Sequence, residues 1–314
     1  MAPRRALVLL FALGLAACAE LKLDAGENFE RADYWDSGLV YHRYIDVAML
    51  PGEMAGPAPV LSGFVSAVAV SGNTMYFIDQ GVAQLVEVDL ATMTARPIAE
   101  IQSPLVNGLY ADDHGKIYVI DRARREVLVL DRYFPGARHL PLAPALGNPL
   151  DVAVIGDGQW LLVLDALEGR VATLDTMGAV SQILRPELPA ASKFITAKAI
   201  AASGNGFLIL DGGADQVIGF DLYGRTYGVF AEDDLSNASA LAADSCGRFF
   251  VADANREGLY LGFSDMSLPG RRVSVPELAS VDVTDLWTDG VFLYVATRAD
   301  GIHVLLLDPA CGEP

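Results

Sequence analysis

The chain has 314 residues, is 52% hydrophobic and carries a formal net charge of −18, from 22 Lys and Arg against 40 Asp and Glu. An acidic chain of this kind lacks the clustered positive charge that binds phosphates, so we expect no nucleic-acid partner. The same charge argues against a protein that lies flat on anionic lipid. The apolar content suffices for a large core, which an all-β chain of this length can form in one domain.

The N-terminal segment has the pattern of an export signal. Arg4 and Arg5 precede an apolar run from Leu7 to Leu15, which is too short to span a membrane because a spanning helix needs about 20 residues. The run continues into Leu15-Ala-Ala-Cys18, which resembles the lipobox of bacterial lipoproteins. This resemblance implies cleavage after residue 17 and lipidation of Cys18, as in a palmitate-bearing lipoprotein. The alternative is an ordinary signal peptide that is cut near residue 17 or 19.

The residue after Cys18 bears on the location of the protein. Residue 19 is Ala, whereas an Asp at this position favours retention in the inner membrane in enterobacterial lipoproteins. The resemblance therefore implies an outer-membrane lipoprotein in the cell envelope, facing the periplasm or the cell surface and held by its lipid anchor alone. We expect residues 1–17 to be the signal peptide, residues 18–37 the lipidated Cys and a tether, and residues 38–314 a single domain.

One pattern recurs along the rest of the chain: an apolar strand ending in Asp, a short polar turn, and a further apolar strand. It first reads Met75-Tyr-Phe-Ile-Asp79 followed by Leu85-Val-Glu-Val-Asp89. Later copies end their first such strand at Asp121, Asp165, Asp211, Asp253 and Thr297, in steps of 42 to 46 residues. No gap has the long helical period that a chain of βαβ units would need. A repeat of this length with three or four short apolar strands predicts an all-β fold, a six-bladed β-propeller with four-stranded antiparallel blades.

The last blade lacks an outer strand, because the chain ends soon after Asp308. The run from Leu39 to Leu50 precedes the first blade and has no partner within it. We expect this N-terminal strand to complete the last blade, which would close the ring and remove exposed sheet edges.

The repeat resembles that of NHL-repeat six-bladed propellers over roughly residues 60 to 308. The closest copy is Asp112-Asp-His-Gly-Lys-Ile-Tyr-Val-Ile-Asp121, and Phe263 and Thr297 depart from the pattern where Asp is expected. The resemblance implies the fold but no single function, since such propellers serve many roles. The recurring Asp residues lie one per blade and cannot converge on one site, so we expect them to cap the turns that follow them.

The central channel is the better place for a site. Another strand is expected before each strand that ends at Asp79, Asp121, Asp165, Asp211, Asp253 or Thr297, which makes the latter the second strand of its blade. Residues fourteen positions before the end of each second strand are expected at the channel mouth, namely Val65, Asn107, Asp151, Ala197, Ser239 and Val283. Polar neighbours and two Arg residues in turns on the same face complete a candidate ligand site, which consists of Asn107, Asp151, Asn148, Lys198, Asn237, Ser239, Arg122 and Arg298. A polar channel filled with water is the plainer expectation.

The sequence gives no sign of a cofactor or a zinc site, and we predict no bound metal. Propellers of the regucalcin and gluconolactonase type hold a divalent metal in the channel, but two Val and one Ala stand in the ring expected here. Cys246 and Cys311 follow strands that end on the same face of neighbouring blades, which favours a disulfide between them in an exported protein.

These observations favour a non-enzymatic scaffold that binds another envelope protein. One alternative is a lactonase-type hydrolase with a divalent cation in the channel. Another is a protein that binds a small anion at Arg122 and Arg298.

Overall fold

The computed structural model describes most of the chain after residue 38. The described residues are 39–52, 59–101, 106–142, 146–156, 158–166, 169–175, 177–185, 194, 196–204, 206–231, 234–255, 258–265, 270–299 and 301–307. Cys18, the lipobox, the tether and Cys311 lie outside these ranges, so the lipidation and the Cys246–Cys311 disulfide stay predictions. Within them, no helix has the length and apolar character needed to cross a membrane.

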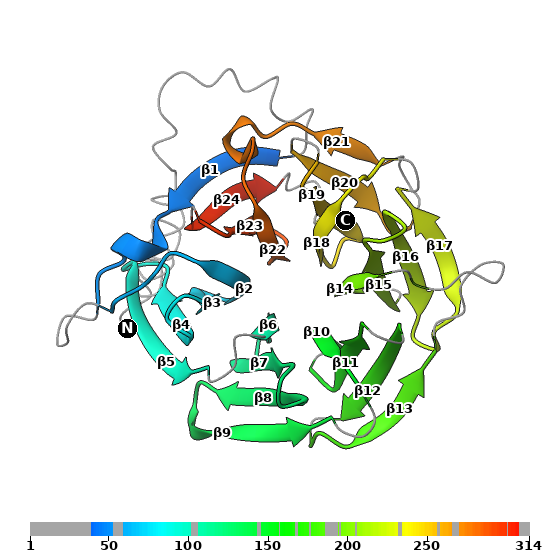
Figure 1. The fold of residues 1–314 in the computed structure, drawn as a ribbon, viewed down its shortest axis with the longest axis horizontal. Helices are drawn as coiled ribbons and strands as arrows, with labels where there is room; N and C mark the ends of the chain where they lie inside the picture. Colours follow the sequence, from blue (N-terminus) through cyan, green and yellow to red (C-terminus); the bar gives the residue numbers. More distant parts are fainter. Residues whose placement is uncertain are drawn as a thin grey trace, which may run out of the picture. The chain divides into compact units, whose positions relative to one another are not determined.

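Residues 37–314 form one compact unit of six four-stranded antiparallel sheets arranged in a ring, a β-propeller, as the repeat predicts (Figure 1). The first strand of each blade lies next to the central channel and the others follow outward. Blade 1 contains β2 (Val65–Ser71), β3 (Thr74–Asp79), β4 (Gln84–Asp89) and β5 (Thr94–Glu100). Blade 2 contains β6 (Val106–Ala111), β7 (Lys116–Asp121), β8 (Glu126–Asp131) and β9 (Phe134–Pro141). Blade 3 contains β10 (Pro149–Ile155), β11 (Trp160–Asp165), β12 (Arg170–Asp175) and β13 (Val180–Leu184).

The second half of the ring repeats this order. Blade 4 contains β14 (Ala197–Ser203), β15 (Gly206–Asp211), β16 (Gln216–Asp221) and β17 (Thr226–Phe230). Blade 5 contains β18 (Ala238–Ala243), β19 (Arg248–Asp253), β20 (Leu259–Phe263) and β21 (Arg271–Val273), followed by the short 3-10 helix η2 (Pro276–Leu278). Blade 6 contains β22 (Val283–Thr288), β23 (Phe292–Thr297) and β24 (Gly301–Leu307), with β1 (Leu39–Ile45) as its outer strand.

The outer strand of blade 6 comes from the start of the described chain. β1 runs antiparallel to β24, with Leu39 opposite Leu307 and Ile45 opposite Ile302. The strand ends at Ile45, earlier than the full run of residues 39–50, because the Asp46 side chain accepts a hydrogen bond from Ala48 N at 3.1 Å and starts the 3-10 helix η1 (Val47–Met49).

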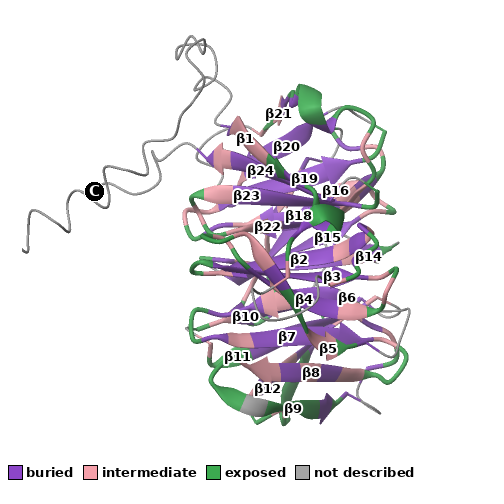
Figure 2. Cartoon of the chain, turned by 90° about the vertical axis from the view of Figure 1, so that its left-hand side faces the viewer, coloured by how far each residue is buried: buried purple, intermediate pink, exposed green. Residues whose placement is uncertain are grey.

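The core lies between the blades. β3, β15 and β19 are buried at every position, which explains why the second strands are continuously apolar instead of alternating. Figure 2 shows buried residues along the strands and exposed residues concentrated in the turns at the two faces. The largest fully buried side chains include Tyr76, Phe77, Phe207, Phe220, Phe249 and Phe250.

The Asp residues that end the second strands cap turns, as expected. The Asp79 carboxylate accepts from Gly81 N at 3.0 Å in the following turn and from Ser62 N at 2.6 Å in the connection that precedes blade 1. Asp253 does the same for Asn255 N and Ser236 N. Each of these buried carboxylates therefore fixes two loops of its own blade, and neither is available for chemistry in the channel.

Candidate functional site

Each blade carries a β-bulge near the start of its innermost strand. After the bulge, the inner strand pairs with the residue that precedes the end of the second strand, as Asp151 does with Leu164 and Asp285 with Ala296. In blade 2 the pairing resumes at Leu109 opposite Val119. The structurally equivalent positions around the channel are therefore Ala67, Gly108, Asp151, Ala199, Ala240 and Asp285.

This ring differs from the set of residues selected by a constant spacing of fourteen residues. The turns between the first and second strands differ in length, so a constant spacing selects equivalent positions only by chance. Of the six residues in the predicted set, Asp151 alone belongs to the ring of equivalent positions. Val65, Ala197 and Val283 lie before the bulge of their strands, where they pair with Asp79, Asp211 and Thr297.

The sequence prediction missed Asp285, although a signal for it exists. Asp151 and Asp285 each stand five residues before a turn glycine with positive φ, Gly156 at +62° and Gly290 at +88°. Alignment of the blades on this glycine, in place of the Asp that ends the second strand, would have paired the two residues.

Asp151 and Asp285 make the same contacts in blades 3 and 6, which lie opposite each other in the ring (Figure 1). Asp151 accepts from Val152 N at 2.8 Å and from Ile200 N of blade 4 at 2.9 Å. Asp285 accepts from Leu286 N at 2.9 Å and from Val68 N of blade 1 at 2.9 Å. Each carboxylate therefore joins its own blade to the next one in the ring.

Burial disfavours the charged form of both carboxyl groups, so both have raised pKa values. Burial raises the pKa of Asp151 to about 6, even though the N–H groups of Ile200 and Val152 favour its charged form. Burial also raises the pKa of Asp285 well above its ordinary value, and the charge of Asp151 raises it further. The two groups thus sense one another across the channel, as like charges in a confined space do.

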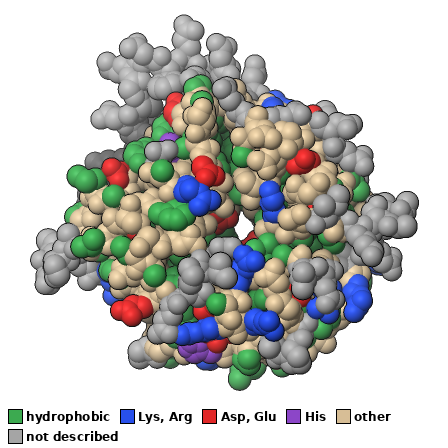
Figure 3. Space-filling model, viewed as in Figure 1, with side chains coloured by type: hydrophobic (Ala, Val, Ile, Leu, Met, Phe, Trp, Pro, Cys, Tyr) green, Lys and Arg blue, Asp and Glu red, His purple; other side chains and the backbone are tan. Residues whose placement is uncertain are grey.

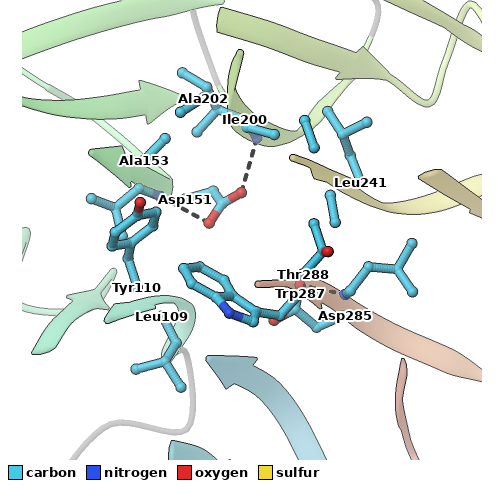
Figure 4. A pocket seen from close by; sticks show the side chains of 15 residues that line it. Leu109, Tyr110, Asp151, Ala153, Ile200, Ala202, Leu241, Asp285, Trp287 and Thr288 are labelled. Atoms are coloured by element: carbon cyan, nitrogen blue, oxygen red, sulfur yellow. Dashed lines mark hydrogen bonds between the residues drawn. The ribbon is translucent and has the colours of Figure 1, made fainter. Parts of the chain in front are cut away.

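A small chamber of about 80 Å³ lies between these strands and is lined by Asp151 and Asp285 (Figure 4). Tyr110 and Trp287 form part of its wall and meet edge to face, with ring centroids 4.7 Å apart. Gly108 leaves room for this arrangement, because a Cβ at that position would lie 2.8 Å from the Asp151 Cα and 2.9 Å from its Oδ1.

The chamber opens into a wide funnel of about 940 Å³ on the face that carries the turns between first and second strands. Tyr110, Ala202, Ala243, Trp287 and Thr288 line both spaces. Among its described lining residues the funnel has no Lys or Arg, but it contains Asp112, Asp113, Asp244 and Asp289.

The other polar residues predicted at the channel belong to the opposite face and are engaged in separate contacts. Figure 3 shows Lys and Arg side chains around the central opening on one face. Arg122 donates to Asn148 Oδ1 at 3.0 Å, and Lys198 Nζ donates to the Ala238 carbonyl at 2.6 Å. The remaining predicted residues are distributed as follows: Arg298 pairs with Asp282, Asn237 N donates to Asp253, Ser239 Oγ donates to the Ala252 carbonyl, and the Asn107 side chain is outside the described part.

The described residues do not fit a divalent metal in the channel. Such a cation takes six or more oxygen ligands, and the described lining of the chamber offers only two carboxylates, Asp151 and Asp285. No group of three or more His, Cys, Asp or Glu side chains gathers at a possible metal site in the described part of the chain.

No protein-family model and no curated protein matches the chain. Solved structures share its fold. Gluconolactonase from Xanthomonas campestris is 15% identical, with 79% of this chain and 87% of that chain covered at a TM-score of 0.62. A catalytically inactive virginiamycin B lyase from Staphylococcus aureus, solved with quinupristin, is 12% identical, with 78% and 80% covered at a TM-score of 0.59. At such identities the likeness shows the β-propeller fold alone.

Proposed function

We propose that the mature protein is a lipid-anchored envelope scaffold whose propeller binds another protein through the funnel. One observation carries the proposal: the polar side chains around the channel are used to hold the propeller together. Asp151 and Asp285 join neighbouring blades, and so does Lys198 by its bond to blade 5. The ring also has a wide hollow on one face, which offers a partner protein a concave surface to bind.

The membrane part of the proposal rests on the sequence. The Leu15-Ala-Ala-Cys18 segment supports lipidation, and Ala19 supports delivery to the outer membrane. Replacing Cys18 with Ser should abolish incorporation of a palmitate analogue and release the protein from the membrane fraction, because one lipidated residue is the proposed anchor. A Cys18→Ser protein that still fractionates with the membrane would contradict the lipid anchor.

The binding part can be tested by site-specific photo-crosslinking in intact cells. A photoreactive amino acid at Gln159, which lines the funnel, should capture a defined envelope protein. The matched control is Val60, which is 82% exposed and lies in the connection leading into β2, on the opposite face. Capture of the same proteins from both positions, or from neither, would overturn the assignment of the funnel as the binding face.

The lactonase-type alternative has support from the shared fold with gluconolactonase only. It requires a divalent cation that the described chamber residues do not fit. The scaffold is therefore the function that the geometry supports best.

A further inference from the structure

The inner chamber has unused capacity to accept hydrogen bonds. A carboxylate offers about four acceptor positions, and Asp151 and Asp285 each use two for backbone N–H groups. The Tyr110 hydroxyl has no hydrogen-bond partner among the described residues, and Figure 4 shows its ring beside Asp151 at the chamber. Three oxygen-bearing side chains from blades 2, 3 and 6 therefore border one space.

The charges along the channel axis are arranged for a cation. The funnel and chamber together contain six Asp and no Lys or Arg among their described lining residues. Asp244 forms an ion pair with Arg248, and Asp112 and Asp289 cap turns by accepting backbone N–H groups. Arg122, Lys198 and Arg298 lie on the opposite face, where they contact Asn148, Ala238 and Asp282. The Asp residues of the funnel therefore favour the entry of a cation, which meets the Asp151 and Asp285 carboxylates in the chamber.

The size of the chamber and the arrangement of its hydrogen-bond acceptors select the kind of cation. Its volume of about 80 Å³ equals that of two or three water molecules, enough for an ammonium head and its first methylene groups. An ammonium group is a compact point charge with three donors. A guanidinium needs both oxygens of one carboxylate along a free edge, but a backbone N–H already occupies each oxygen of Asp151 and of Asp285.

The aromatic wall suits the remainder of such a ligand. Trp287 and Tyr110 meet edge to face and line the opening between chamber and funnel. Their rings offer an apolar surface to an aliphatic stem and a negative face to the cation.

We propose that the inner chamber is a binding site for a primary ammonium group on an unbranched aliphatic stem, which enters through the funnel and lies between Asp151 and Asp285. The proposal deepens the scaffold function and rests on it for the source of the amine, which would be a lysine side chain of the partner protein.

Titration calorimetry with n-butylammonium in an amine-free buffer tests the site directly. Saturable binding is expected, whereas n-butanol and butyrate, which lack the positive charge, should show none. Absence of saturable binding by n-butylammonium would overturn the site. This result would leave crosslinking at Gln159 unaffected, so failure of the site and failure of the scaffold function can be told apart.

Variants locate the site. Asp285→Asn should weaken n-butylammonium binding by about tenfold or more, because a charged hydrogen bond is lost, and Tyr110→Phe should weaken it less while preserving the ring. Asp282→Asn is the matched control, since Asp282 pairs with Arg298 on the opposite face and is exposed. Equal affinity in the Asp285→Asn and Tyr110→Phe variants and the wild type would place the amine elsewhere.

The source of the amine is tested with two further probes. A short peptide with a central lysine should bind at least as tightly as n-butylammonium, and the same peptide with an acetylated lysine should not bind. Binding of n-butylammonium without binding of the peptide would replace the partner's lysine by a free amine as the ligand.

Discussion

Replacing Arg248 with Met should lower the free energy of unfolding by about 3–5 kcal/mol, the usual effect of removing one partner from a buried ion pair. Arg248 Nε donates to Asp244 Oδ2 at 2.6 Å, and the two side chains are only 6% and 1% exposed. Arg248 also donates to the Gly290 carbonyl of blade 6 at 3.2 Å. Methionine replaces the unbranched stem of the Arg side chain without its guanidinium group, so it leaves the Asp244 carboxylate buried without its cation.

The chain contains a matched control for this prediction. Asp221-Leu-Tyr-Gly-Arg225 repeats the pattern of Asp244-Ser-Cys-Gly-Arg248, with the same contact between the carboxylate and the Arg Nε at 2.8 Å. The control pair is at the surface, with side chains 66% and 27% exposed, so Arg225→Met should cost at most about 1 kcal/mol. Urea unfolding measures both variants. Similar midpoints for the two variants would show that burial does not govern the strength of this pair.

Stability should fall as the pH rises from 4 towards 8, and Asp285→Asn should reduce this fall. The pKa values of Asp151 and Asp285 are raised in the folded state, so above the unfolded pKa of about 4 the folded protein binds more protons than the unfolded chain. The stabilisation is complete below that pH and is lost as the pH rises through the folded values. For Asp151, a change from 3.8 to about 6 corresponds to about 3 kcal/mol.

The comparison between variants isolates the pair from other titrating groups. Asn at position 285 removes one raised carboxyl group and the repulsion that it exerts on Asp151. The stability of the variant should therefore fall less steeply than that of the wild type between pH 4 and pH 8, as thermal unfolding across this range would show. The exposed control Asp282→Asn should follow the wild-type profile. Parallel profiles for Asp285→Asn and the wild type would mean that the two carboxylates do not interact.

Much of the fold follows from local sequence. The recurring Asp residues mark the strand ends because a carboxylate caps the adjacent turn within a few residues, as Asp79 does for Gly81. The apolar second strands and the period of 42 to 46 residues then define six blades. These signals are local or periodic, so they can be recognised without knowledge of the folded chain.

Which residues form the candidate site in the channel depends on the tertiary structure. A constant distance from the strand end does not identify Asp285, because turn lengths and bulges differ between blades, and the pairing with Ala296 establishes that it is equivalent to Asp151. Its partner Val68 is 217 residues away in the chain. The contacts of Arg122 and Lys198 also depend on the folded ring, because their partners Asn148 and Ala238 are 26 and 40 residues away in the chain. The sequence by itself therefore determined the propeller, whereas ring closure and register determined which two carboxylates face each other in its channel.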